Sequence, residues 1–205
     1  MRTSPTCIVP PRRQRGFSLI EVSIVTAIVL LAAIVGIPAI GNYVVENKVP
    51  NVGEELQRFV SRTKANAQGA GPTPYAGIDT GALANALRDS SVLSVNGTGA
   101  ASVVAHGLGG NGTSGNGVVS LAPSVFAAGG AGSGFTLTLN NVSHAACPGI
   151  ASVMQRVAEI ISVQGQGGAV VVKDATATPP LAYLATRAEA QCAQGDHNTF
   201  VFTAR

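Results

Sequence analysis

The sequence has no tryptophan, few aromatic residues and little charge. Of its 205 residues, 11% are charged and 4% are aromatic, whereas 46% are hydrophobic and 25 residues are glycine. So low a charged fraction is unusual for a soluble cytosolic enzyme, and so apolar a chain is not expected to be disordered throughout. The length suits one domain, with or without an appended segment.

Acidic residues are missing from one part of the chain. None precedes Gly16, whereas four of the 13 basic residues, Arg2, Arg12, Arg13 and Arg15, lie there. Nine basic residues therefore face ten acidic ones beyond Gly16. A basic N-terminal segment suits a membrane-orientation signal. The slightly acidic remainder offers no basic stripe, so we expect no nucleic-acid partner.

One long apolar run follows the arginines. Residues 17–41 contain a single charged residue, Glu21. As a helix rising about 1.5 Å per residue, this segment would span roughly 37 Å, enough to cross a hydrocarbon core of about 30 Å. Because the arginines lie on its N-terminal side, we expect the N-terminus to stay cytoplasmic and the rest to be exported.

An ordinary signal peptide or a plain membrane anchor is the simplest interpretation of this run. A signal peptide, however, is cut after a shorter apolar stretch that ends in small residues. A carboxylate within an apolar span also costs about 2.5–3.5 kcal/mol on insertion scales. Glu21 is therefore expected to have a partner charge.

The segment 15–22 reads RGFSLIEV and resembles the prepilin peptidase site of type IV pilins and type II secretion pseudopilins. The resemblance implies cleavage after Gly16 on the cytoplasmic side and N-methylation of Phe17, the new first residue. It also implies that Glu21 neutralises the terminal amine of a neighbouring subunit during filament assembly. Pro38, which removes a backbone donor, is expected to kink the helix.

The cysteines divide in the same way. Cys7 lies in the basic segment, which leaves Cys147 and Cys192 as a pair, and two cysteines in an exported chain are more often bridged than reactive. The region that they bound resembles that of type IVb pilins of the plasmid thin-pilus and toxin-coregulated kind. Phe17 and Pro38 look more like the type IVa helix, so the subclass stays open.

We therefore expect three parts: a cleaved basic leader at 1–16, a spine helix at 17–68 with its transmembrane half at 17–41, and a globular head at 69–205. The expected fold is α+β, with the long helix packed on an antiparallel sheet. Within the spine, Asn51 and Glu54 resemble a capping box, which predicts that the helix restarts after Pro50.

The head contains further periodic segments. Two helices are expected, the first starting at Asp79 or Thr80 and ending near residue 88, the second at 148–164. Alternating or β-rich runs predict strands at 102–105, 118–121, 135–139, 169–173 and 199–203, with the last strand at the sheet edge.

Two enzyme-like motifs lack their structural context. Residues 107–112 match a dinucleotide-binding glycine pattern, but no helix can follow them. Residues 61–64 match a Ser-x-x-Lys nucleophile motif without its companion motifs. His106, His144 and His197 lack metal-ligand spacing. We expect no enzymatic activity, no cofactor and no metal.

The resemblance implies a structural subunit of a type IV pilus. The precursor would reside in the inner membrane, and the mature form in an extracellular filament serving adhesion, motility, aggregation or conjugation. Its partners would be copies of itself, the prepilin peptidase, the inner-membrane assembly machinery and the outer-membrane secretin. A type II secretion pseudopilin and a minor pilin remain open alternatives. An anchored hydrolase is disfavoured because no nucleophile–base pair is recognisable.

Overall fold

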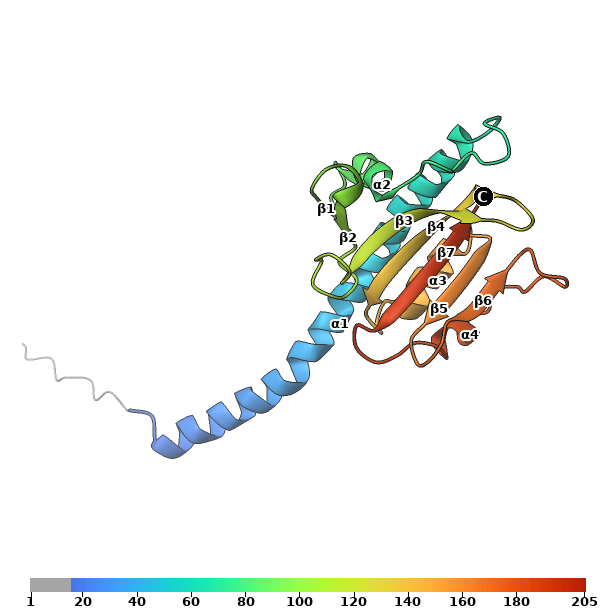
Figure 1. Cartoon of the computed structure of the whole chain (residues 1–205). Coiled ribbons are helices and arrows are strands. Elements are labelled where there is room, and N and C mark those ends of the chain that lie inside the picture. Colours follow the sequence, from blue (N-terminus) through green and yellow to red (C-terminus); the bar gives the residue numbers. More distant parts are fainter. Residues whose placement is uncertain (1–15) are drawn as a thin grey trace, which may run out of the picture. The chain divides into compact units, whose positions relative to one another are not determined.

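The computed structural model describes residues 16–205 and contains two compact units (Figure 1). The first unit ends at Ile40, and the second is Gly41–Arg205. Helix α1 (Leu19–Asn66) contributes to both. Because the backbone stays helical at residue 38 and the side chains of Pro38 and Ala39 lie outside the described part, the kink at Pro38 stays a prediction.

The second unit combines the C-terminal part of α1 with one antiparallel sheet, which confirms the α+β prediction. Its sheet order is β1-β2-β3-β4-β7-β5-β6. The strands are β1 (Ser94–Asn96), β2 (Val103–Ala105), β3 (Val118–Val125), β4 (Ala131–Val142), β5 (Ile160–Gln164), β6 (Val170–Asp174) and β7 (Asn198–Ala204). The shorter helices are α2 (Thr80–Leu87), α3 (Cys147–Met154) and α4 (Ala185–Glu189), with a 3-10 turn η1 (Gly99–Ala101).

The head part of α1 lies along one face of this sheet (Figure 1). Apolar residues recur along it every three or four positions and form one core with the inner face of the sheet. The buried residues of this stripe are Val49, Val52, Leu56, Phe59 and Val60. The apolar residues that recur at helical spacing in the sequence are thus the ones that pack this part of α1 into the head.

The predicted restart after Pro50 is wrong, because α1 continues through it without a break. Pro50 is exposed, whereas Val49 and Val52 on either side are buried. At Gly53 the helix approaches α3 so closely that a Cβ would overlap the Val153 side chain. Packing on both sides of the proline therefore holds a helical path that the local sequence disfavours.

The predicted helix at 148–164 is also wrong beyond its first two turns. Helix α3 ends at Met154, and the Lys173 ammonium takes up two carbonyls of the turn that follows, donating to Gln155 O and Ala158 O at 2.6 Å each. The β-branched residues from Ile160 onward then form β5, which pairs with both β6 and β7. The spacing of the apolar residues is compatible with a helix, but from Ile160 onward the chain pairs with two neighbouring strands of the sheet instead.

Strand β7 lies inside the sheet, between β4 and β5, and not at its edge as the sequence predicted. Its Phe200 and Phe202 are buried and their rings are stacked with centroids 5.7 Å apart. The edge strands are β1 and β6. The other expected strands are observed, and Asp79 caps α2 by accepting a hydrogen bond from Ala82 N at 2.9 Å.

A disulfide joins Cys147, at the start of α3, to Cys192, just beyond α4, as the sequence predicted. The two Cα atoms are 6.0 Å apart, and both residues are buried. The bridge closes a loop of 45 residues that contains β5 and β6. It therefore ties the start of α3 to the segment that leads into β7.

Sequence analysis missed a buried histidine that joins the loop after β2 to strand β4. His106 Nε2 donates to Asn140 O at 2.8 Å, and Nδ1 accepts from Leu108 N at 3.0 Å. Close by, the Asp196 carboxylate accepts from Gly110 N at 2.8 Å. Burial lowers the pKa of His106, opposed by its bond to Asn140 and by the charge of Asp196. The ring is therefore held neutral, with both nitrogens satisfied.

Removing the disulfide should destabilise the head. For a loop of 45 residues the chain-entropy model gives a loss of about 4 kcal/mol in the free energy of unfolding. We expect this loss in a Cys147→Ala/Cys192→Ala double variant, measured by denaturant titration of the detergent-solubilised chain. A Cys7→Ala variant is the control and should match the parent. Equal stability of all three proteins would contradict the prediction.

The head should lose stability in mild acid because of His106. The pKa of His106 is lowered from 6.5 in the folded chain, so below pH 6.5 protons favour the unfolded chain. From pH 7.5 to 5.5, above the range of carboxylates, the free energy of unfolding should fall by up to about 1.4 kcal/mol. The His106→Gln variant should be less stable than the parent at pH 7.5, but its free energy of unfolding should change less between pH 7.5 and 5.5. The control variant His197→Gln, at an exposed site, should show the same pH dependence of the free energy of unfolding as the parent chain. A free energy of unfolding that does not change with pH in the parent chain would refute the prediction.

Candidate functional site

The first part of α1 exposes large apolar side chains all along its length. Phe17 is 87% exposed and Leu19 is 88% exposed. Others exposed there are Ile20, Val22, Ile24, Val25, Ile28, Val29, Leu30, Leu31, Ile34, Val35, Ile37 and Ile40. An 18-residue window of α1 has a mean hydropathy of 2.6, and none of it is buried in the structure. By length and composition, α1 is the one described helix able to cross a membrane.

The hydroxyl groups within this apolar segment are satisfied by the helix itself. Ser23 Oγ donates to Leu19 O at 2.8 Å, and Thr26 Oγ1 donates to Val22 O at 2.9 Å. Such bonds to the preceding turn remove the need for water. Glu21 is consequently the single charged group that an apolar environment would have to accommodate between residues 17 and 41.

Glu21 has a local role that sequence analysis missed. Its Oε2 accepts a hydrogen bond from the backbone N–H of Ser18 at 2.9 Å, and α1 begins at the next residue, Leu19. This is the glutamate half of a capping box, in which the carboxylate accepts the backbone N–H of the residue that precedes the helix. The Ser-x-x-Glu spacing ahead of an apolar run was the signal that could have revealed it.

The cap leaves part of the carboxylate available. Within residues 16–205, Oε1 of Glu21 accepts no hydrogen bond, and no ion pair involves Glu21. A carboxylate near a helix N-terminus also lies in the favourable field of the aligned peptide dipoles. Glu21 is therefore oriented by its own helix and still able to accept a bond from a cation.

The bond between Gly16 and Phe17 precedes the helix. Both residues are exposed and non-helical, and a Cβ placed on Gly16 would meet no atom within 4 Å. The rest of the predicted leader, residues 1–15, lies outside the described residues. Cys147 and Cys192 lie in the head and have a structural role there.

The described residues contain no group of three or more His, Cys, Asp or Glu side chains that could hold a metal ion. His106 is committed to backbone hydrogen bonds, and His144 Nε2 lies 3.4 Å from Gln194 Nε2. The apolar helix with its capped N-terminus is therefore the candidate site, and its chemistry is association with lipid or with other helices.

Two known protein families match parts of the chain. The family described as "prokaryotic N-terminal methylation motif" matches residues 11–37. The family described as "PilS N terminal" matches residues 53–205, which is most of the chain. The chain belongs to the PilS family of type IV pilins. The expected family is thereby confirmed, and this pilin is a structural subunit of the type IV pilin class.

Solved structures are also similar to this pilin, and one of them is a type IVb pilin. The crystal structure of type IV b pilin from Salmonella typhi shares 24% sequence identity with it and has a TM-score of 0.48. The match covers 76% of this chain and 96% of that chain. No curated protein sequence matches the chain.

Proposed function

We propose that this pilin is made as an inner-membrane precursor, cleaved after Gly16, methylated on Phe17 and polymerised into an extracellular pilus. A dedicated prepilin peptidase cleaves it, and assembly machinery in the inner membrane and an outer-membrane secretin build and export the filament. The pilus serves adhesion, motility, aggregation or conjugation.

One observation carries this proposal: the large apolar side chains in the first part of α1 are exposed. More than a dozen large apolar residues before Gly41 are exposed, each about 1.5–3 kcal/mol more favourable when removed from water. A bilayer removes this apolar surface from water before assembly, and the helices of neighbouring subunits remove it from water in a filament core.

The charge distribution supports a single orientation of the precursor. All four basic residues before Gly16 precede the apolar segment, and the disulfide lies in the head that follows it. Positive flanks stay in the cytoplasm, whereas disulfides persist in oxidising compartments. The N-terminus therefore stays cytoplasmic and the head faces outward.

Cleavage after Gly16 creates an amine at Phe17, next to the capped start of the helix. In a bundle of apolar helices this amine needs a carboxylate, and Glu21 of a neighbouring subunit is the acid that the apolar segment offers. The free oxygen of the Glu21 carboxylate is available to accept it. The pair would fix the axial position of one subunit against the next.

The processing step predicts a specific mature form. Protein taken from cells should begin at Phe17 and carry one added methyl group on its terminal amine. A Gly16→Val variant should keep its leader, because a branched side chain crowds the scissile bond. Intact-mass measurement and N-terminal sequencing test both. Cleavage after Ala39, or an uncleaved parent chain, would remove the proposal.

The assembly step predicts that Glu21 is needed for filaments but not for cleavage. Glu21→Val should give processed, membrane-held subunits and few or no filaments, because the terminal amine loses its partner. Shearing of surface filaments, electron microscopy and the mass of the membrane form provide the measurements. If Glu21→Val remains uncleaved, Glu21 belongs to the processing signal and the proposed division of roles is wrong.

A matched variant separates the two roles of Glu21. Glu21→Gln keeps an acceptor for the Ser18 N–H, as glutamine also serves in capping boxes, but it removes the negative charge. We expect Glu21→Gln to be as poor in filaments as Glu21→Val. Normal piliation by Glu21→Gln would show that the cap, and not the pairing with an amine, is what assembly requires.

A further inference from the structure

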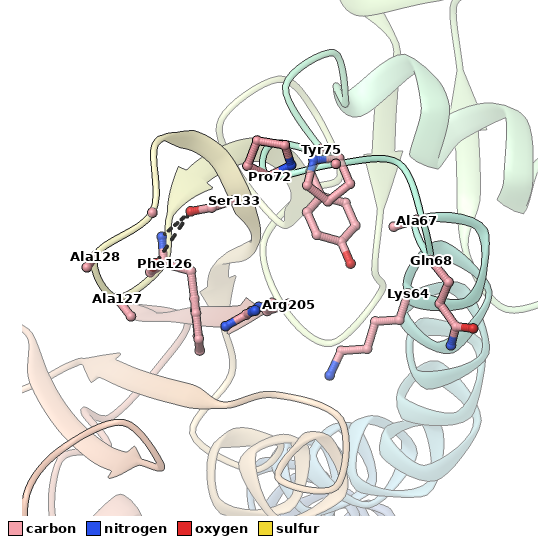
Figure 2. Close-up of a pocket in the computed structure, with 13 residues that line it drawn as sticks. Lys64, Ala67, Gln68, Pro72, Tyr75, Phe126, Ala127, Ala128, Ser133 and Arg205 are labelled. Carbon is pink, nitrogen blue, oxygen red and sulfur yellow. Dashed lines mark hydrogen bonds between the residues drawn. The ribbon is translucent and has the colours of Figure 1, made fainter.

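The head contains a hollow that neither the helix nor the family accounts for. It lies where the C-terminal end of α1, the loop that follows it, the β3–β4 hairpin and the end of β7 meet (Figure 2). Its volume is about 830 Å³. Thirteen residues line it, including the cations Lys64 and Arg205 and no acidic residue.

Tyr75 places an unused polar group in this hollow. The residue is only 5% exposed, and its ring is held by Phe135, with the ring centroids 4.8 Å apart. No partner for its hydroxyl lies within the described residues, and Figure 2 shows the hydroxyl turned toward the open space. Burial raises the pKa of Tyr75 more than the charge of Arg205 lowers it. The group therefore stays a hydrogen-bond donor at neutral pH.

The two cations are held in place and keep unused donors. The Arg205 guanidinium lies over the Phe126 ring, 5.8 Å from its centroid, and takes part in no ion pair among residues 16–205. Lys64 Nζ donates to Glu159 Oε1 at 3.1 Å, which leaves two of its three N–H groups. Figure 2 shows both groups facing the same space as the Tyr75 hydroxyl.

We propose that this pocket binds an acidic sugar, whose carboxylate pairs with Arg205 and Lys64 and one of whose hydroxyls accepts a hydrogen bond from Tyr75. Arg205 takes part in no ion pair among residues 16–205, and Lys64 keeps two N–H groups beside its bond to Glu159, so both can donate to a carboxylate. The rings of Pro72 and Pro74, which also line the pocket, offer apolar surface to the C–H face of a sugar ring. A volume of about 830 Å³ lies in the usual range for small-molecule sites and accommodates a disaccharide.

Because the sequence has no tryptophan, ligand binding near Tyr75 can be followed by tyrosine fluorescence. With three tyrosines in the chain, tyrosine fluorescence reports on Tyr75 without interference from indole. Digalacturonate titrated into the detergent-solubilised full chain should change this emission, and calorimetry should give a saturable 1:1 isotherm. Galactobiose, its neutral counterpart, should bind at least tenfold more weakly, as should the dipeptide Glu-Glu.

Variants test each contact. Arg205→Gln and Lys64→Gln should each weaken digalacturonate binding at least tenfold, since each removes a charge-assisted hydrogen bond. Tyr75→Phe keeps the ring and should abolish the fluorescence change while weakening the affinity in calorimetry. Arg62→Gln is the matched control: it is exposed on the same helix, outside the pocket, and changes the net charge equally. It should bind as the parent does.

Thermal unfolding of every variant checks that the head remains folded, and Lys64→Arg, which keeps the charge, should retain most of the affinity. No binding of digalacturonate to the parent chain would overturn the proposal. Equal binding of the Glu-Glu dipeptide, or equal weakening by Arg62→Gln, would overturn it too, because the pocket would then recognise charge alone.

Discussion

The constraint on which this molecule depends is that the first part of α1 cannot stay in water. Its exposed side chains are nearly all apolar, its hydroxyls bond to its own backbone, and its one carboxylate caps its own first turn. The apolar surface favours a helix surrounded by hydrocarbon or by other helices, and the internal bonds satisfy polar groups that such surroundings would otherwise leave without partners. The segment is therefore suited to successive apolar environments, which a precursor in a bilayer and a subunit in a filament both provide.

The same helix changes its role beyond Gly41. From Val49 onward apolar residues occupy one stripe, and this stripe closes the core that the sheet cannot close alone. Two long-range links reinforce the head: the disulfide ties α3 to the chain ahead of β7, and His106 ties the loop after β2 to β4 through a backbone carbonyl. The head part of α1 is thus itself a piece of this core.

What the sequence predicted well was local. The apolar run, the Asp79 cap and the alternating strand at 135–139 each express a short-range pattern, and the structure contains them. The failures all involve distant partners. Pro50 stays helical because residues on both sides pack against the head, and Ile160 enters a strand because β6 and β7 lie beside it. The pocket at Tyr75 could not be anticipated, because three segments far apart in the sequence form it. The Ser18 cap is the exception, a local signal that was present and overlooked.

The cap changes how a buried charge at Glu21 should be understood. A carboxylate in an apolar segment is costly mainly because it loses water, but Glu21 receives a backbone N–H from Ser18 and the positive end of its own helix. Part of the penalty is thus offset within one subunit, before any partner arrives. The bond to Ser18 also restricts the side chain, so pairing with an amine loses less rotamer freedom than it would for a free glutamate. A carboxylate ordered in this way presents its second oxygen at a fixed height on the helix. If the proposed pairing with a neighbour's amine forms, a polar contact at this fixed height favours one axial register among otherwise apolar helices.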